Sequence, residues 1–485
     1  MFVVFTYPEK DFIRTTPEAQ GIRSIGIVNL LKDMRDTGID VHSLLIMRHG
    51  RLVHEQYFAP YTKDTKHSMY SCSKTFTSML VGVACDKGLI KLSDKVVSFF
   101  PEELSQIAEP NEYLLSMTIE DLLMMGSGHG QDTFGYMMEK VQDPDADFVR
   151  IFLNRPVDHK PGTHFVYNTG ATYMCAAILQ KVTGKRLIDL ANEWLFNSLG
   201  IEGAYWDTCP KGIAIGGSGL HVLPTDMLRL GMMIMEHGRW KNEQLVSQAY
   251  IAAAQKKHIE NRSGDPAQDH NWAAGYGYQM WRCDFDCFRA DGMGGQYIVM
   301  IPRLDMIVVI TSAMGDPKPM GYLLDEIETI LLPEVHDNIQ CVSVDDTAEL
   351  KALSEELEKN EITGKPEDVD FPFGQRMVLS ENKMKYSAVT VTETEVIVET
   401  DQGDIKAEYG WNGYKNNEHV NTFWRWNNFS DLGAKALWED GVLHLRLQYV
   451  GEPFTTDLWF TKADGRMQVK IRSLKDGSDE AECAL

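Results

Sequence analysis

Long hydrophobic runs are missing from this sequence of 485 residues. Its longest apolar stretches, Ile298–Pro302 and Met306–Ile310, have the length of a strand and fall far short of the roughly 18 residues that a membrane-spanning helix needs. The N-terminal segment also lacks a basic start followed by an apolar core, which a secretory signal requires. We therefore expect no signal peptide, no membrane partner and a cytoplasmic location.

Positive charge is scarce as well. Lys and Arg number 47 against 70 Asp and Glu, so the formal net charge is −23. A surface this acidic repels phosphate backbones, which argues against a nucleic-acid partner. The hydrophobic share of 44% and the charged share of 24% are those of an ordinary globular protein, and we expect its partner to be a small molecule or a peptide. The oligomeric state is not predicted.

Metal-binding patterns are absent. The sequence contains neither Cys-x-x-Cys nor His-Glu-x-x-His, spacings that hold zinc in many proteins, so we predict no metal site. The eight cysteines are scattered, and we expect them to be buried free thiols in a reducing compartment. They are Cys72, Cys85, Cys175, Cys209, Cys283, Cys287, Cys341 and Cys483.

The spacing of apolar residues changes between strand and helix periods along the first part of the chain. A hairpin comes first, a helix-rich middle follows, and strands and a final helix close the segment. This order predicts an α+β fold, with one antiparallel sheet flanked by helices, for a domain over residues 1–335. The expected elements are a hairpin over 43–57, a helix over 76–84 ended by Gly88, a helix over 172–182, strands over 296–301 and 306–311, and a helix over 323–331.

The composition changes after residue 335. Residues 336–364 include an acidic, helix-like stretch over 345–360 and are predicted to be a linker. Beyond it, apolar and polar residues alternate and no helical pattern competes with them. We therefore predict a separate C-terminal antiparallel β domain over residues 365–485. Its expected strands cover 388–400, 442–449, 454–461 and 467–471.

The pattern Ser71-Cys72-Ser73-Lys74 places a serine and a lysine three residues apart at the start of a predicted helix. That spacing puts both side chains on one helix face, and a serine at a helix N-terminus meets backbone N–H groups that can stabilise an oxyanion. A serine hydroxyl is a weak nucleophile and needs an adjacent base. Ser380-x-x-Lys383 fits the same pattern with no apolar helix behind it, so we treat it as a decoy.

Two other segments place polar groups beside turns. Pro161–Gly170 delivers Tyr167 directly before a helix, where Tyr167 is either a core residue or a site residue and Asn168 or Thr169 is a candidate N-cap. Arg289–Tyr297 is rich in glycine and enters a strand. Its glycines either mark a bulge or let a ligand approach the backbone. Neither segment identifies a site by itself.

Taken together and in this order, the three segments resemble the class C β-lactamase-like serine hydrolases, a family that includes penicillin-binding proteins, D-peptidases and esterases. Three further segments are similar to motifs of that family. Leu122–His129 resembles its Leu-Leu-x-x-x-Ser-Gly loop, Gly216–Leu220 its glycine-rich turn, and Gly275–Trp281 the strand that borders its active site. The resemblance covers about residues 20–335 and implies a β-lactamase/transpeptidase-like fold and an enzyme that needs no cofactor.

The resemblance also implies a role for each matching residue. Ser71 would be the nucleophile that forms an acyl-enzyme, Lys74 its base or proton relay, and Tyr167 the group that passes a proton to the leaving group. The backbone N–H groups of Ser71 and Met293 would form the oxyanion hole. A lysine has a reference pKa near 10.4 and acts as a base only when it is desolvated or lies beside other cations. Alternatively, Lys74 stays charged and stabilises a tyrosinate at 167, and the sequence does not decide between these two bases.

The sequence departs from the family pattern at two places. Members commonly read Tyr-x-Asn, whereas here Thr169 takes the third position and the asparagine is residue 168. Members often carry Lys-Thr-Gly or His-x-Gly where this chain has Ala290-Asp291-Gly292, so the cation that binds a penicillin carboxylate is missing. Arg289 is an alternative cation, although neighbouring strand residues point to opposite faces. These departures argue against efficient β-lactamase activity and favour hydrolysis of an ester, amide or peptide bond.

Two alternatives to a general serine hydrolase remain open. In the first, Asp291 recognises the amine of a substrate, as an aminopeptidase-type member would need. In the second, the chain is a non-hydrolytic sensor that recognises penicillin. Among the expected substrate-binding residues, His129 either lines the pocket or lies on a solvent-facing loop. The full set is Asn168, Thr169, Asp291, Gly292, Gln279 and His129.

Overall fold

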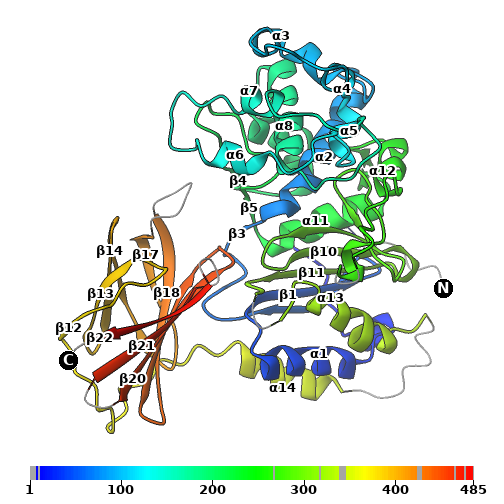
Figure 1. The fold of residues 1–485 in the computed structure, drawn as a ribbon. Coiled ribbons are helices and arrows are strands. Elements are labelled where there is room, and N and C mark those ends of the chain that lie inside the picture. Colours follow the sequence, from blue (N-terminus) through cyan, green and yellow to red (C-terminus); the bar gives the residue numbers. More distant parts are fainter. Residues whose placement is uncertain are drawn as a thin grey trace.

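A six-stranded antiparallel sheet lies at the centre of the computed structural model (Figure 1). Its strand order is β2-β1-β11-β10-β9-β8, so the first two strands of the chain lie beside strands that come much later. The structure describes residues 7–8, 11–265, 268–315, 318–337, 346–422, 429–463, 466–473 and 477–483. The strands of the sheet are β1 (Val41–Arg48), β2 (Arg51–Tyr57), β8 (Trp281–Arg282), β9 (Phe288–Gly292), β10 (Gln296–Ile301) and β11 (Met306–Ser312).

Both faces of this sheet are buried. Successive side chains of a strand point to opposite faces, and along β1 Leu45 and Met47 enter one hydrophobic core whereas Leu44 and Ile46 enter another. Helices α1 (Ser24–Thr37), α13 (Tyr322–Glu326) and α14 (Thr347–Leu357) cover one face, and α2 (Ser73–Asp86), α8 (Thr169–Thr183) and α11 (Pro224–Met235) belong to the core on the other (Figure 1). In the part of the chain that the structure describes, no helix is both long and apolar enough to cross a bilayer.

Shorter elements complete the helical layer. Small strands β3, β5 and β4 form a sheet beside α2, and β6 pairs with β7. The helices are α3 (Pro101–Leu104), α4 (Glu112–Ser116), α5 (Ile119–Leu123), α6 (Phe134–Met138), α7 (Phe148–Leu153), α9 (Leu187–Ala191), α10 (Asn197–Leu199) and α12 (Gln248–Gln255), and the strands are β3 (His67–Ser68), β4 (Tyr205–Trp206), β5 (Leu220–Val222), β6 (Arg239–Trp240) and β7 (Glu243–Gln244).

The predicted α+β class is confirmed, and most expected elements lie where the sequence placed them. The hairpin is β1–β2, and the helix over 76–84 is the buried part of α2. Gly88 follows α2 with a φ of 71°, a left-handed conformation that glycine adopts without a steric penalty. The helix over 323–331 is α13, continued by a π-helical turn over Ile327–Leu331.

The predicted linker contains a packed helix. Leu350 and Leu353 of α14 are buried in the same core as the apolar side of α1, and Lys32 Nζ of α1 lies 2.7 Å from a carboxylate oxygen of Glu349. The acidic residues therefore occupy the outer face of a helix whose apolar face packs into the core of the six-stranded sheet and its helices, which we call the sheet unit. Residues 347–357 belong to that unit by packing and are not a free tether.

The C-terminal part of the chain is all-β, as predicted. We call its strands β12–β22 the β region; they form a four-stranded sheet, β12-β13-β14-β15, and a seven-stranded sheet around β18 and β19. Both sheets contribute to one hydrophobic core. The strands are β12 (Arg376–Val378), β13 (Tyr386–Val391), β14 (Glu395–Thr400), β15 (Gly403–Glu408), β16 (Gly410–Trp411), β17 (Lys415–Asn421), β18 (Phe429–Glu439), β19 (Val442–Tyr449), β20 (Phe454–Ala463), β21 (Arg466–Ser473) and β22 (Gly477–Cys483).

One expected strand, 388–400, is a hairpin of β13 and β14. The hydroxyl of Thr392 accepts the backbone N–H groups of Thr394 (3.3 Å) and Glu395 (2.9 Å). A threonine side chain that bonds the backbone two and three residues ahead stabilises a turn. This local hydrogen bonding reverses the chain within a stretch whose alternation is typical of a single strand.

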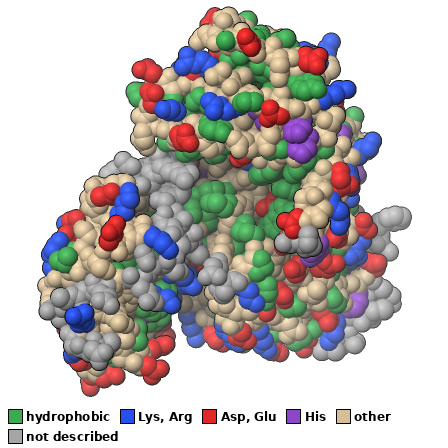
Figure 2. Space-filling view, in the orientation of Figure 1, with side chains coloured by type: hydrophobic (Ala, Val, Ile, Leu, Met, Phe, Trp, Pro, Cys, Tyr) green, Lys and Arg blue, Asp and Glu red, His purple; other side chains and the backbone are tan. Residues whose placement is uncertain are grey.

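The β region lies against the sheet unit and below the helical layer (Figure 1). Figure 2 shows a recess where these three parts meet, with hydrophobic side chains gathered inside it. At this junction Glu452 of the β region contacts Tyr70, which precedes the serine predicted to be the nucleophile.

The two-sided sheet generates a stability prediction. Ile298 is fully buried and its side chain packs between β10 and α11, so Ile298→Ala removes apolar contacts that the surroundings cannot restore. We expect it to lower the free energy of unfolding by about 2–5 kcal/mol, measured by denaturant titration. Val378→Ala is the control, because Val378 is 56% exposed on β12 and should change stability by less than about 0.5 kcal/mol. Equal losses in the two variants would contradict this account of the core.

Candidate active site

Ser71 lies in a 3-10 turn, Tyr70–Cys72, directly before α2. The preceding strand β3 pairs with β5, and the buried stripe of α2 holds the other end of the turn in the core. The turn begins with an unusual backbone, because Tyr70 has a φ of 44°. A non-glycine residue with positive φ is uncommon and persists only when its surroundings hold it.

Lys74 is only 1% exposed, and its amine meets three oxygen atoms. Nζ lies 2.8 Å from Ser71 Oγ, 3.1 Å from Thr169 Oγ1 and 2.8 Å from the carbonyl oxygen of Gly217. A neutral amine has two hydrogens and one lone pair. If the hydrogens go to Thr169 and Gly217, the lone pair faces the hydroxyl of Ser71. The arrangement therefore suits a lysine that accepts the serine proton.

Burial shifts the pKa of this amine in the direction that such a base needs. Removal from water lowers the pKa of Lys74 to about 7, and the carboxylate of Asp132 opposes the shift. Desolvation disfavours the charged form of a buried lysine, which is the expected direction. Near neutral pH a large fraction of Lys74 is thus unprotonated without any neighbouring cation.

Tyr167 lies against the same pair. Its ring centroid is 4.8 Å from Lys74 Nζ and 5.2 Å from the stacked ring of Trp281. Burial raises the pKa of Tyr167 well above its ordinary value, and a hydrogen bond with Ser71 only partly offsets this. The phenol is therefore neutral, which favours Lys74 over a tyrosinate as the base and leaves Tyr167 as a proton donor.

In the altered Tyr-Asn-Thr motif, Asn168 and Thr169 make different contacts. Thr169 supplies the hydroxyl that contacts Lys74. Asn168 is fully buried and turns away, because its Oδ1 accepts the backbone N–H of Thr133 at 3.1 Å and its hydroxyl at 2.9 Å. Asn168 thus supports the loop before α6 and does not contact Lys74.

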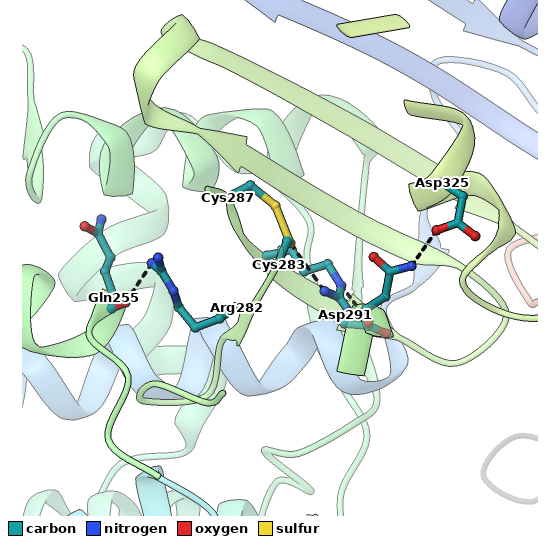
Figure 3. The surroundings of a disulfide bond; sticks show 8 residues. Gln255, Arg282, Cys283, Cys287, Asp291 and Asp325 are labelled. Carbon is teal, nitrogen blue, oxygen red and sulfur yellow. Dashed lines mark hydrogen bonds and ion pairs between the residues drawn. A yellow bond between two sulfur atoms is a disulfide. The ribbon is translucent and has the colours of Figure 1, made fainter. Parts of the chain in front are cut away.

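Arg289 and Asp291 lie on the same face of β9 and form a buried ion pair (Figure 3). Arg289 Nε donates to Asp291 Oδ2 at 2.9 Å, and both side chains are at most 8% exposed. Residues two apart on a strand share a face, so Arg289 and Asp291 point to the same side although Ala290 between them points to the other. The carboxylate of Asp291 is therefore already paired with a cation, which argues against the alternative in which it recognises a substrate amine. Arg289 in turn is not a free cation for a carboxylate.

The prediction of free cysteines is wrong for one pair. Cys283 and Cys287 form a disulfide between β8 and β9, and Arg289 Nη1 lies 3.4 Å from Cys283 Sγ (Figure 3). The two Cα atoms are 5.1 Å apart because the strands pair across a short turn, a separation that suits a disulfide. Cys341 lies outside the described residues. Free thiols are found at Cys72, Cys85, Cys175 and Cys209.

The side chain of Gln279, which we predicted to contact substrate, makes hydrogen bonds within the protein. Its amide nitrogen donates to the carbonyl oxygens of Leu122 (3.1 Å) and Leu123 (2.8 Å). Its amide oxygen accepts the hydroxyl of Thr172 at 2.6 Å. The side chain is 2% exposed and ties α5 and α8 together behind the site.

His129 is 1% exposed, so the expectation of a solvent-facing loop is wrong. Its Nδ1 lies 3.0 Å from Ser127 Oγ, and burial lowers its pKa to about 4. Together with Thr133 and Tyr136 it lines a cavity of about 430 Å³. The loop that follows Ser127 folds inward because the backbone at His129 pairs with Val157.

The end of β9 approaches the nucleophile. Gly292 packs so closely on the carbonyl oxygen of Met69 that a Cβ at this position would collide with it. Met293 follows in the turn, with its side chain 47% exposed. The close approach brings this turn beside the segment that carries Ser71. The backbone N–H groups of Ser71 and Met293 stay our prediction for the oxyanion hole.

Two residues of the site were not predicted. Gly217 contributes a carbonyl acceptor, and only its place in the glycine-rich turn 216–220 pointed toward the site. Asp132 is exposed, accepts the backbone N–H of Thr169 at 2.9 Å, and acts on Lys74 through its charge. No sequence signal distinguishes it from the other acidic residues of the chain.

The family follows from the fold and from comparison with known proteins. The family model described as Beta-lactamase matches residues 27–328, more than half of the chain, and the chain belongs to this family. One relative is the 6-aminohexanoate-dimer hydrolase of Paenarthrobacter ureafaciens. It is 24% identical over 335 residues, which cover 64% of this chain and 84% of the relative.

Solved structures share the fold at low sequence identity. EstCE1, described as a hydrolase with promiscuous acyltransferase activity, has a TM-score of 0.53 and 17% identity and covers 63% of this chain and 98% of its own. The octameric penicillin-binding protein homologue from Pyrococcus abyssi has a TM-score of 0.51 and 16% identity. Its match covers 94% of this chain and 99% of that chain, so it extends over the β region.

The shifted amine of Lys74 predicts the pH dependence of the reaction. The unprotonated amine accepts the serine proton, so kcat/KM for an ester should rise with pH through about 7 and fall about tenfold per pH unit below it. Rates measured between about pH 5.5 and 8.5 test this profile. A flat or falling profile over this range would exclude Lys74 as the base.

Lys74→Arg is the companion variant. A guanidinium stays protonated and cannot accept a proton, so kcat/KM should fall by about 10²–10⁴ at all pH values. Lys87→Arg, at the exposed end of the same helix, is the control and should keep the wild-type rate and profile.

Proposed function

We propose that this protein is a serine hydrolase that cleaves an ester, amide or peptide bond through an acyl-enzyme on Ser71. The contact of 2.8 Å between the buried amine of Lys74 and the hydroxyl of Ser71 carries the proposal. A nucleophile within hydrogen-bond distance of a base, with the base oriented by further groups, is the arrangement that nucleophilic catalysis requires. Thr169 and Gly217 are those orienting groups.

The first half of the reaction forms the acyl-enzyme. Ser71 Oγ attacks the carbonyl carbon of the substrate while its proton moves to Lys74 Nζ. The carbonyl oxygen becomes an oxyanion, which the backbone N–H groups of Ser71 and Met293 would stabilise. The tetrahedral intermediate then collapses, and the departing amine or alkoxide takes a proton from Tyr167. The protonated amine of Lys74, which lies over the Tyr167 ring, returns a proton to that phenolate.

The second half restores the enzyme. A water molecule takes the place of the leaving group, loses its proton to the same pair of groups and attacks the acyl carbon. The acid product leaves, and the proton returns to Ser71 Oγ. The proton thus passes among Ser71, Lys74 and Tyr167, whose side chains lie against one another.

The exposed carboxylate of Asp132 favours a substrate with a positively charged amine. Its Oδ1 is held by the backbone N–H groups of Thr169 and Phe134, both at 2.9 Å, at the helix start beside Lys74. Asp291 cannot fill this task because Arg289 neutralises it. One relative is named for hydrolysing a 6-aminohexanoate dimer, a dimer of an amino acid. We therefore propose amides with a nearby amine as the preferred class.

The nucleophile is tested with a fluorophosphonate probe and a chromogenic short-chain ester. Wild-type protein should be labelled and should hydrolyse the ester, and Ser71→Ala should do neither because no hydroxyl faces Lys74. Ser380→Ala is the matched control, since Ser380 is exposed in the β region and fits the same Ser-x-x-Lys pattern. Tyr167→Phe should lower turnover by about 10²–10⁴ through loss of the proton donor.

Three outcomes would overturn parts of this proposal. Labelling that persists in Ser71→Ala would remove Ser71 from the mechanism. Stoichiometric labelling of wild type without turnover of any ester or amide would favour the penicillin-recognising sensor. Equal effects of Tyr167→Phe and Ser380→Ala would contradict the choice of motif.

Asp132→Asn tests the substrate class. Asparagine still accepts the two backbone N–H groups but carries no charge, so kcat/KM for an amine-bearing amide should fall about tenfold while that for a neutral ester changes less than about twofold. Assays at about pH 8 keep Lys74 mostly unprotonated in both proteins. Asp145→Asn, an exposed position between α6 and α7, is the control. Parallel changes for both substrates would reject amine recognition by Asp132.

A further inference from the structure

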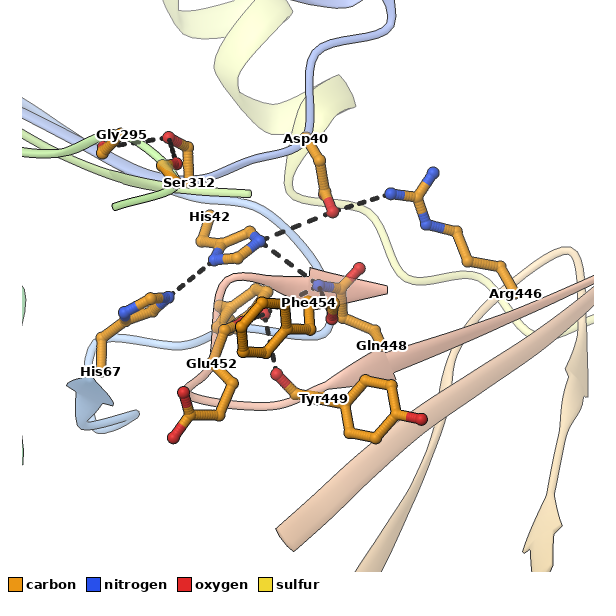
Figure 4. Close-up of polar contacts among 12 residues, drawn as sticks. Asp40, His42, His67, Gly295, Ser312, Arg446, Gln448, Tyr449, Glu452 and Phe454 are labelled. Carbon is orange, nitrogen blue, oxygen red and sulfur yellow. Dashed lines mark hydrogen bonds and ion pairs between the residues drawn. The ribbon is translucent and has the colours of Figure 1, made fainter. Parts of the chain in front are cut away.

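The turn between β19 and β20, residues Tyr449–Phe454, reaches from the β region to the segment before the nucleophile (Figure 4). The backbone N–H of Ser68 donates to the carbonyl oxygen of Gly451 at 2.7 Å. Gly451 has a φ of 85°, and a Cβ there would press on the carbonyl oxygen of Lys66. The turn thus pairs with the chain three residues before Ser71.

Two side chains of the turn hold Tyr70, the neighbour of Ser71. The hydroxyl of Tyr70 donates to Glu452 Oε2 at 3.0 Å, and its ring meets Phe454 edge-on with centroids 6.0 Å apart. Tyr70 is the residue with the φ of 44°. A positive φ at a bulky aromatic residue is strained and needs external support. Both of these contacts come from the β region.

The same turn also touches the opposite side of the site. Pro453 packs on Gly294 so closely that a Cβ at Gly294 would collide with the proline ring. Gly294 follows Met293, and its carbonyl oxygen accepts the hydroxyl of Ser312 at 2.7 Å and the N–H of Met314 at 2.8 Å. The glycine turn is therefore clamped between β11 and Pro453.

These contacts place one turn of the β region against both backbone segments whose N–H groups would donate to an oxyanion. We propose that Tyr449–Phe454 is a positioning element for the oxyanion hole, in which Glu452 fixes Tyr70 and so the N–H of Ser71, while Pro453 fixes the turn that carries Met293. This inference rests on the proposed serine hydrolase. Glu452 is a positioning residue, since it acts through Tyr70.

The hairpin is also anchored by contacts that do not use the Glu452 side chain. Gln448 Nε2 donates to the hydroxyl of Tyr61 at 2.9 Å, and Arg446 Nη2 lies 2.7 Å from Asp40 Oδ2 (Figure 4). Tyr61 also donates to the carbonyl oxygen of Glu452 at 3.3 Å. These contacts do not involve the Glu452 side chain. Loss of that side chain should therefore leave the β region docked.

The surroundings of Glu452 make it suitable for substitution. Val450, Gly451 and Glu452 line a cavity of about 520 Å³ between the β region and the sheet unit. Removing the carboxylate therefore enlarges an existing space that water can fill and leaves the hydrophobic cores intact. Tyr70→Phe is a second variant that removes the same hydrogen bond from the other side and keeps the ring on Phe454.

The test compares Glu452→Ala, Glu452→Gln and Tyr70→Phe in the full-length protein with a chromogenic ester. Glu452→Ala should lower kcat about ten- to a hundredfold with KM changed less than about twofold, because a misplaced donor loses part of the 10²–10³ that an oxyanion donor contributes. Glu452→Gln keeps an acceptor for Tyr70 and should restore most of the rate. Glu439→Ala, an exposed carboxylate at the other end of the β18–β19 pair, is the control.

A second readout reports on the oxyanion hole itself. Replacing the carbonyl oxygen of the ester with sulfur removes the oxygen for which the hole is shaped, so wild type should prefer the ester over its thionoester. Glu452→Ala and Tyr70→Phe should reduce this preference at least about threefold, and the double variant should be no worse than either single one. An unchanged preference, or strictly additive losses, would overturn the proposal.

Failure of this inference can be told apart from failure of the proposed function. If Ser71→Ala keeps its activity, the serine mechanism itself is wrong. If Ser71→Ala is inactive while Glu452→Ala matches wild type and Glu439→Ala in kcat and in thionoester preference, only the positioning role of the turn is wrong. Thermal melting of each variant identifies any that does not fold, and Tyr70→Phe then decides the outcome.

Discussion

The burial of one amine beside one hydroxyl is the constraint on which the proposed chemistry depends. Lys74 contacts Ser71 at 2.8 Å, and the core around α2 keeps its amine out of water. Desolvation lowers its pKa to about 7, so it can act as a base at neutral pH. The two-sided sheet, the helical layer and the closed glycine-rich turn at Gly217 together maintain this dry environment. Without that packing the lysine would be a charged surface residue and Ser71 an ordinary hydroxyl.

The site differs from the family pattern in its charges more than in its geometry. Thr169 makes the contact to Lys74 although the asparagine has moved to 168. Where relatives often have a free cation, this chain buries the Arg289–Asp291 pair, which presents little net charge to a ligand. Asp132 carries an exposed carboxylate beside the start of α8, where it accepts the backbone N–H of Thr169. These differences underlie our proposal of amine-bearing amides, and they leave the contact between Ser71 and Lys74 in place.

The parts predicted as a catalytic domain, a linker and a separate β domain pack against one another in this fold. The helix α14 of the predicted linker packs on α1, and the turn Tyr449–Phe454 reaches the residues that flank Ser71. The backbone of Tyr70 is strained, and a strained backbone persists only when contacts around it hold it. The contact with the turn is one of these. The β region supplies such contacts, and through them it contributes to the geometry of the proposed oxyanion hole.

Much of the fold could be predicted from the sequence alone, and the structure brings together the three side chains that the sequence singled out, Ser71, Lys74 and Tyr167. Local periodicity sufficed for β1, α2, β10 and β11, and the order of the Ser71, Tyr167 and Asp291 segments indicated the family. Local patterns could not show that Thr392 reverses a strand, that β8 and β9 bring Cys283 to Cys287, or that Arg289 neutralises Asp291. Nor could they show that Asp132, Gly217 and Glu452 adjoin the site. The positions of Asp132, Gly217 and Glu452 depend on which backbone segments lie side by side. The packing of the whole chain decides this pairing, because distant segments gain the free energy of burial and desolvation only when they are in contact.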